Sequence, residues 1–129
     1  MSKIIVMILL VALNGSAMAE WTKVTEEKDG SAVYYSDTSS IQKSAGNLTI
    51  IWELTDLKEP DIDGIRSTKA QVEYDCVRER FRVLYAIAYS QNMGSGDVIV
   101  KLSPSEIENE PISPDSIDAC MWQLACGQK

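Results

Sequence analysis

Two segments in the middle of the chain alternate between apolar and polar residues. In residues 65–76, one face carries Ala70, Val72, Tyr74 and Cys76. In residues 80–90, one face carries Phe81, Val83, Tyr85, Ile87 and Tyr89. A repeat of two residues is typical of a β-strand in a sheet that has one solvated face. The pattern therefore predicts two strands, each with a single apolar face.

Other segments extend this prediction in both directions along the chain. Residues 21–25, 32–36, 48–57 and 97–102 are rich enough in β-branched, aromatic or other apolar residues to form strands. Residues 91–96 are predicted to form a turn. Asp37 precedes a short polar stretch and is expected to cap a single helical turn over residues 38–41.

The C-terminal part of the chain has the pattern of a helix. Ser113 is expected to be the N-cap, with Pro114 at the first helical position and Asp115 favoured by the helix dipole. Ile117, Cys120, Met121 and Leu124 fall on one face, and Gly127 ends the helix. Residues 103–114 form an extended, proline-bearing connection. Successive strands followed by one helix predict an α+β domain, an antiparallel meander whose apolar face the helix covers.

The first nineteen residues have the pattern of a secretory leader. Lys3 precedes an apolar run from Ile4 to Leu13, and Ala17 and Ala19 frame a cleavage site before Glu20. We expect cleavage after Ala19, which leaves residues 20–129 as a single domain. The apolar run is shorter than the roughly 20 residues that span a bilayer. It lacks a cysteine for lipid attachment, so we expect export to the periplasm or the medium without a lipid anchor or a membrane span.

The amino-acid composition argues against several classes of function. The net charge of −7 includes Lys3, so the chain without its leader carries −8. Nucleic acids and anionic lipid surfaces require a basic footprint, which this chain lacks. It also contains no histidine, the usual general base near neutral pH and the commonest transition-metal ligand. We therefore expect no enzyme, no metal site, no cofactor and no nucleic-acid partner.

Three cysteines in an exported chain predict one disulfide and one free thiol. Cys120 and Cys126 lie about 9 Å apart along a helix, too far to pair with each other. Cys76 must therefore pair with one of them. The helical wheel favours Cys120, whereas fraying of the last turn would let Cys126 turn inward. If Cys120 is the free thiol, its place on the apolar face predicts that it is buried and inert.

Two charged clusters are weaker candidates for a binding site. Arg78, Arg80 and Arg82 could receive an anion on one strand face, but ion pairs with Glu73 and Asp75 across a hairpin are the simpler interpretation. Asp56, Glu59, Asp61, Asp63 and Gly64 resemble a calcium loop. They lack its twelve-residue carboxylate pattern and its closing glutamate, so a solvated acidic loop is expected.

A larger set of residues follows in order along the chain, namely Trp21, Tyr35, Asp37, Ile41, Trp52, Ser67, Glu73-Tyr74-Asp75-Cys76, Arg82, Tyr89-Ser90, Met93-Gly94-Ser95-Gly96, Pro114-Asp115-Ser116 and Cys126. This set resembles the surface-adhesin protein E domain family of exported Gram-negative proteins. The resemblance implies an antiparallel sheet of about six strands packed by a C-terminal helix. It also implies a disulfide between Cys76 and Cys126, with Cys120 as an additional free thiol.

The resemblance implies a function as well. It indicates an exported, non-enzymatic binding module that holds a protein or a small ligand in an adhesin-like manner. Haem binding, which is associated with the family's named member, would have to use tyrosine or methionine here because histidine is absent. The alternative is a structural or accessory protein of the cell envelope, or an inhibitor of another exported protein. The oligomeric state is left open by the sequence.

Overall fold

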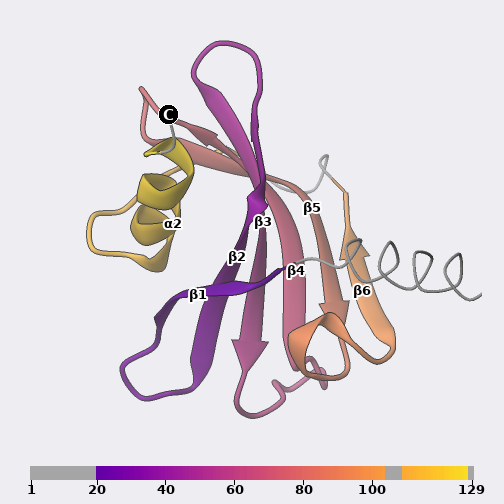
Figure 1. Cartoon of the computed structure of the whole chain (residues 1–129). Coiled ribbons are helices and arrows are strands. Elements are labelled where there is room, and N and C mark those ends of the chain that lie inside the picture. The colour runs from indigo at the N-terminus through magenta and orange to yellow at the C-terminus, as the bar shows by residue number, and fades with distance from the viewer. Residues whose placement is uncertain (1–19, 104–108, 128–129) are drawn as a thin grey trace, which may run out of the picture.

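The structure is a computed structural model that describes residues 20–103 and 109–127. Its elements are β1 (Thr22–Glu26), β2 (Ala32–Lys43), β3 (Leu48–Leu57), β4 (Ser67–Asp75), β5 (Arg80–Tyr89), the 3-10 helix η1 (Asn92–Gly94), β6 (Val98–Leu102), β7 (Glu110–Pro111) and α2 (Ile117–Cys126). Strands β1 to β6 pair in chain order, and every pair is antiparallel. This confirms the predicted meander and its C-terminal helix (Figure 1). The short β7 pairs with the start of β5.

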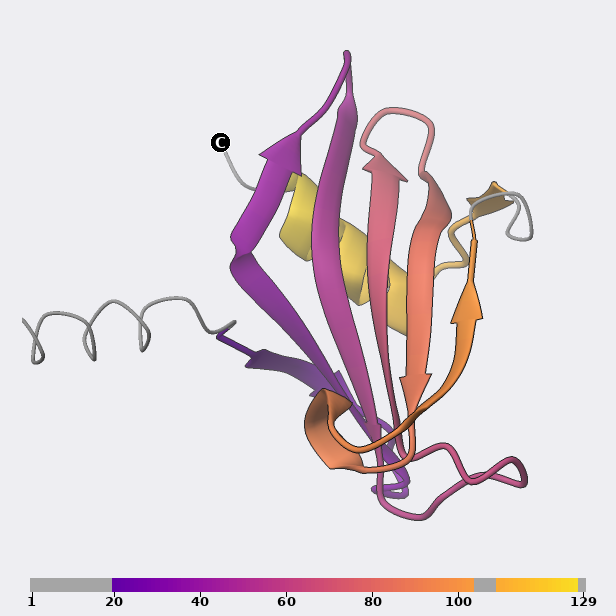
Figure 2. The same cartoon turned by 90° about the vertical axis from the view of Figure 1, so that its right-hand side faces the viewer.

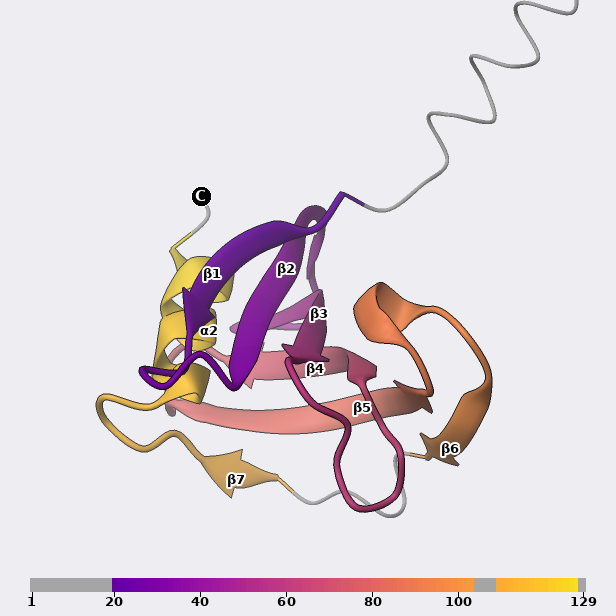
Figure 3. The ribbon, with the colours of Figure 1, turned by 90° about the horizontal axis from the view of Figure 1, so that it is seen from below.

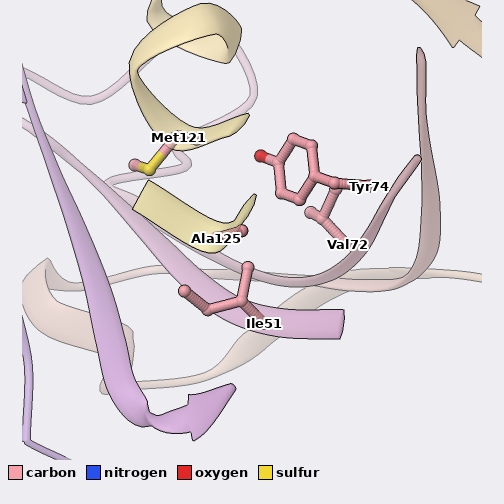
Figure 4. Packing of buried hydrophobic residues seen from close by; sticks show 5 residues of the cluster. All are labelled: Ile51, Val72, Tyr74, Met121 and Ala125. Atoms are coloured by element: carbon pink, nitrogen blue, oxygen red, sulfur yellow. The ribbon is translucent and has the colours of Figure 1, made fainter. Parts of the chain in front are cut away.

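Helix α2 lies across one face of the sheet, and the main core is between them. Figure 2 shows α2 behind the strands, with the opposite face toward the viewer. Ile51, Val72 and Tyr74 point from the strands toward Met121 and Ala125 of α2 (Figure 4). All five side chains are at most 3% exposed. The helix has only ten residues, and an isolated helix of that length is marginal in water, so this contact holds α2 in place.

Strand β5 differs from the predicted alternation at one point. Val83 pairs with Val72, but Tyr85 pairs with Gln71, so Leu84 is an extra residue in β5. Such a bulge moves the following side chains to the other face of the sheet. Phe81 and Val83 therefore pack on the core beneath α2, whereas Tyr85 and the residues after it alternate in the opposite phase. The prediction of a single apolar face along residues 80–90 is wrong.

Strand β2 also differs from the prediction, because no helical turn follows Asp37. The Asp37 carboxylate does accept hydrogen bonds from the backbone N–H and the hydroxyl of Ser39, as a cap would. The chain nevertheless continues as a strand to Lys43, with its register against β3 interrupted between Asp37 and Gln42. There the Ser40 hydroxyl accepts a hydrogen bond from the Trp52 backbone N–H at 3.0 Å. The Ser40 side chain thus takes the place of a backbone hydrogen bond where the register is interrupted, and β2 continues as a strand.

Helix α2 begins three residues later than the sequence indicates. Asp115 has φ +60°, which a right-handed helix cannot contain. The N-cap is Ser116, whose hydroxyl accepts from the Ala119 backbone N–H at 3.1 Å. The helix ends at Gly127, as predicted. In the described residues, no helix is long and apolar enough to cross a membrane.

Candidate binding face

The sheet face opposite α2, called the open face here, carries an aromatic cluster. The rings of Trp52 in β3 and Tyr85 in β5 meet edge to face, with 6.4 Å between centroids and an interplanar angle of 87°. The Lys69 ammonium of β4 lies 5.6 Å from the Trp52 ring centroid, close enough for a cation–π interaction. All three side chains are half-buried. An aromatic pair that keeps one side in water is typical of a protein-binding surface.

The strand register explains why sequence reasoning missed this cluster. Trp52 and Tyr85 both pair with Gln71, from opposite sides of β4, so their side chains share a face. The bulge at Leu84 places Tyr85 there. In the sequence, Tyr85 continues the alternation of Val83, and no residue type marks the change of phase. Ile87, which pairs with Lys69, is brought to the same face in the same way.

The turn at residues 91–96 folds back over the lower end of the open face (Figure 2). The Asp56 carboxylate accepts from the Met93 backbone N–H at 2.8 Å and from the Asn92 amide at 3.1 Å. The Ser67 hydroxyl donates to the Gln91 carbonyl and accepts from the Gly94 N–H. These bonds fix η1 beside the aromatic cluster.

The two glycines of this turn have separate structural reasons. Gly94 has φ +71°, and a Cβ there would lie 3.1 Å from Lys69 Cδ and 3.4 Å from Leu54 Cδ1. Gly96 has φ +82°, and a Cβ there would lie 2.5 Å from Ser90 Oγ. Gly94 is therefore needed where the turn packs onto β3 and β4, and Gly96 where the turn closes against Ser90.

One of the cross-strand ion pairs predicted for the arginine cluster forms, between Glu73 and Arg82, whereas Arg80 and Asp75 bond to backbone groups instead. Glu73 is opposite Arg82 in the register, and their side chains form an ion pair at 3.0 Å. Asp75 is opposite Arg80, whose guanidinium donates to the Asn109 carbonyl. The Asp75 carboxylate instead accepts from the Val77 and Arg78 backbone N–H groups, which lower its pKa.

The acidic loop residues do not converge on one point. Asp61 Oδ1 accepts from the Asp63 and Ile65 backbone N–H groups, both at 2.9 Å, and so shapes its own loop. Asp56 is used in holding η1. In residues 20–103 and 109–127, no group of three or more acidic or sulfur side chains is arranged to hold a metal ion.

The structure contains a disulfide between Cys76 and Cys126, with 5.5 Å between their Cα atoms. It joins the end of β4 to the last residue of α2. The Trp122 indole N–H donates to the Asp75 carbonyl at 3.0 Å, beside the same junction. The helical wheel favoured Cys120 as the partner of Cys76. That prediction is wrong, because Cys126 at the end of α2 lies close enough to the end of β4 to form the bridge.

Cys120 is free, and its side chain is exposed. The expectation that it is buried is wrong. The buried face of α2 is formed by Met121 and Ala125, four residues apart, and Cys120 lies beside that face. It lines a hollow of about 560 Å³ between the β1–β2 turn and the start of α2.

A carboxyl group lies on the sheet face that α2 covers. Glu53 accepts a hydrogen bond from the Tyr74 hydroxyl. Burial, and to a smaller extent the negative charge of Asp118 on α2, raise the pKa of Glu53 to about 7 against the lowering effect of that hydrogen bond. Burial and then Glu110 raise the pKa of Asp118 as well. Ionisation of Glu53 or Asp118 in the folded protein therefore costs free energy.

The chain from residue 21 to residue 127 matches the family model described as surface-adhesin protein E. The chain belongs to the surface-adhesin protein E family. This confirms the resemblance found in the sequence.

Solved structures of Haemophilus influenzae protein E share the fold of this family member. Its crystal form II has 17% sequence identity and a TM-score of 0.59, over 81% of this chain and 87% of that chain. The selenomethionine form has 16% identity and a TM-score of 0.58, over 81% and 85% of the two chains. At these identities the match shows the fold alone. No curated protein sequence matches this chain.

Proposed function

We propose that this protein is an exported, non-enzymatic binding module that holds a partner protein against its open face. The observation that carries the proposal is the half-buried cluster of Trp52, Tyr85 and Lys69 on the sheet face opposite α2. Aromatic side chains with a rigid, partly solvated surface supply much of the energy at protein interfaces. Membership of a surface-adhesin family supports protein binding as the task.

The geometry of the face favours a protein over a small ligand. The Trp52 ring has Tyr85 at its edge and Lys69 over its face, and the Glu73–Arg82 ion pair lies on the same face because Glu73 follows Gln71 by two residues. Small ligands are usually enclosed in a deep apolar pocket. A surface of aromatic and paired charged groups instead resembles the centre and rim of a protein interface.

Export rests on the leader, which lies outside the described residues. We expect mass spectrometry of the protein from its native host to show Glu20 as the first residue, without an attached lipid. The reason is the small-residue pattern before that position. A protein that retains residues 1–19, or that carries a lipid, would contradict this part of the proposal.

In-cell photocrosslinking tests the binding face. Tyr85 is replaced with benzoylphenylalanine, which keeps an aromatic ring in place, and cells of the native host are irradiated. Covalent adducts to another envelope or host-derived protein are expected at this position, because the Tyr85 ring lies beside Trp52 on the open face.

A matched position on α2 is the control. Gln123 is exposed on α2, and α2 lies on the sheet face opposite the one that carries Tyr85 (Figure 2). The same photoreactive residue at Gln123 is expected to give few adducts. Adducts from neither position would favour the structural or accessory role in the envelope and would overturn the proposed binding face.

A further inference from the structure

Two lysines lie in one row of residues across the open face. Lys69 in β4 pairs with Ile87 in β5, and Ile87 pairs with Lys101 in β6. Residues that pair across an antiparallel sheet point to the same side, so both lysines lie on the face that carries Trp52 and Tyr85. Two strand spacings, which amount to roughly 10 Å, separate their backbones. The open face thus presents two ammonium groups beside its aromatic cluster.

The Lys69 side chain is held in place along its length. Its Cδ lies against the turn that carries η1, where a Cβ on Gly94 would be 3.1 Å away. Its ammonium lies 5.6 Å from the centroid of the Trp52 ring. A side chain packed in this way has less rotamer freedom to lose when a partner binds. Lys69 is therefore a preorganised cation on the open face.

The carboxylates of this face are bonded elsewhere. Four of them lie on it by register, and each accepts a hydrogen bond from another group of the chain: Asp37, Asp56, Glu73 and Asp75. Within residues 20–103 and 109–127, the ion pairs are Lys23–Glu26 and Glu73–Arg82, so neither Lys69 nor Lys101 has a carboxylate partner.

The side of the molecule that carries α2 is acidic in contrast. The hollow beside the start of α2 is lined by acidic residues that include Glu27, Asp29 and Asp115, and Asp118 lies on the helix itself. Figure 3 shows α2 and η1 on opposite sides of β3 and β4. An acidic partner is therefore repelled from the α2 side and attracted by the lysines of the open face, and such a charge distribution orients a partner during association.

A partner that covers the open face must also satisfy Lys69. Contact with a protein surface removes water from the Lys69 ammonium, which is already half-buried. A cation that loses its hydration without gaining an opposite charge costs free energy. The chain supplies no carboxylate for it, so the partner has to.

We propose that the protein held by the open face is acidic, with carboxylates that bind Lys69 and Lys101 while its apolar side chains cover Trp52 and Tyr85. This inference rests on the proposed function and gives the chemistry of the partner. A sulfated polysaccharide fits the face less well, because a uniformly anionic chain also meets carboxylates such as that of Glu73.

Fluorescence anisotropy of labelled peptides with the purified protein tests the proposal. One probe alternates glutamate and tyrosine, and the other alternates lysine and tyrosine. The acidic peptide is expected to bind at least about tenfold more tightly than the basic one at low ionic strength, and to weaken as salt screens the charges. Lys69→Gln is expected to weaken its binding about fivefold and the more exposed Lys101→Gln about twofold. Lys69→Arg, which keeps the charge, is expected to retain the preference for the acidic peptide.

Lys43→Gln is the matched control. Lys43 is exposed at the end of β2 and pairs with Thr49, which lies two residues before Ile51 on the face toward α2. Loss of the same charge there is expected to leave the affinity unchanged, and melting curves verify that each variant is folded. Equal affinity for the two peptides, or undiminished binding of the acidic peptide by Lys69→Gln, would overturn the proposal. Tighter binding of a heparin fragment than of the acidic peptide would also overturn it, in favour of a polysaccharide.

The peptide result and the photocrosslinking result are separable. An adduct at Tyr85 without a preference for the acidic peptide would overturn the acidic partner and leave the proposed function intact. A preference that depends on Lys69, without an adduct at Tyr85 in cells, would overturn the proposed function and support recognition of acidic chains by this face.

Discussion

Replacing Cys76 with serine is expected to lower the free energy of unfolding by about 4 kcal/mol. The disulfide closes a chain segment with a sequence separation of 50 residues, and removing it restores that conformational freedom to the unfolded state. The loss is large against the roughly 5–15 kcal/mol of a typical domain. It also releases α2, which has only ten residues and covers the core.

Urea unfolding without added oxidant or reductant measures this effect, because the wild-type bridge then stays intact. Unfolding is followed by tryptophan fluorescence, to which Trp122 contributes from beside the bridge. Cys120→Ser is the control, because Cys120 is exposed and unbridged. Its free energy of unfolding is expected to stay within about 0.5 kcal/mol of that of the wild-type protein. An unchanged midpoint for Cys76→Ser would show that the bridge does not stabilise the fold.

Replacing Glu53 with glutamine is expected to stabilise the protein at pH 8 and to change little at pH 4. The pKa of Glu53 is raised to about 7 in the folded protein by burial and by Asp118. A carboxyl with a raised pKa favours folding while it is protonated, and this contribution is lost as the pH rises from the unfolded value through 7. At pH values above 7, this pKa shift lowers the free energy of unfolding of the wild-type protein by about 3 kcal/mol.

Glutamine keeps an oxygen that can accept the Tyr74 hydrogen bond but carries no charge. Thermal unfolding is measured from pH 4 to pH 8, with Glu59→Gln as the control for the loss of one charge in an exposed loop. Glu53→Gln is expected to gain stability relative to the wild-type protein as the pH rises, whereas Glu59→Gln is expected to show no such trend. Equal pH dependence in the two variants would mean that the Glu53 carboxyl is not penalised by the fold.

The strand order was predictable because alternation over long segments leaves few arrangements for an antiparallel meander. Strand β3 has the predicted bounds, Leu48–Leu57, and the other five differ mainly at their ends except for the longer β2. The family resemblance supplied the pairing of Cys76 with Cys126, which the helical wheel did not favour. That failure has a simple reason, since the wheel treats the last residue of a helix as though it were in the middle.

The aromatic cluster was not predictable from the same pattern. Its position depends on the extra residue Leu84, which changes the face of Tyr85 without any glycine, proline or polar residue to signal a bulge. The exposed position of Cys120 depends likewise on how α2 is rotated against the sheet, which buries Met121 and Ala125 and leaves Cys120 beside them. In both cases, the orientation of an element decides which side chains face the open side of the sheet, the core or the solvent.

The adduct yields at Tyr85 and Gln123, compared in intact cells, test the central claim most directly. Tyr85 contacts Trp52 on the open face, and Gln123 is exposed on α2. A partner bound to the open face predicts a discrete adduct from Tyr85, with the yield at Gln123 at background. A yield at Gln123 equal to or greater than that at Tyr85 would show that the partner binds elsewhere and would contradict the account.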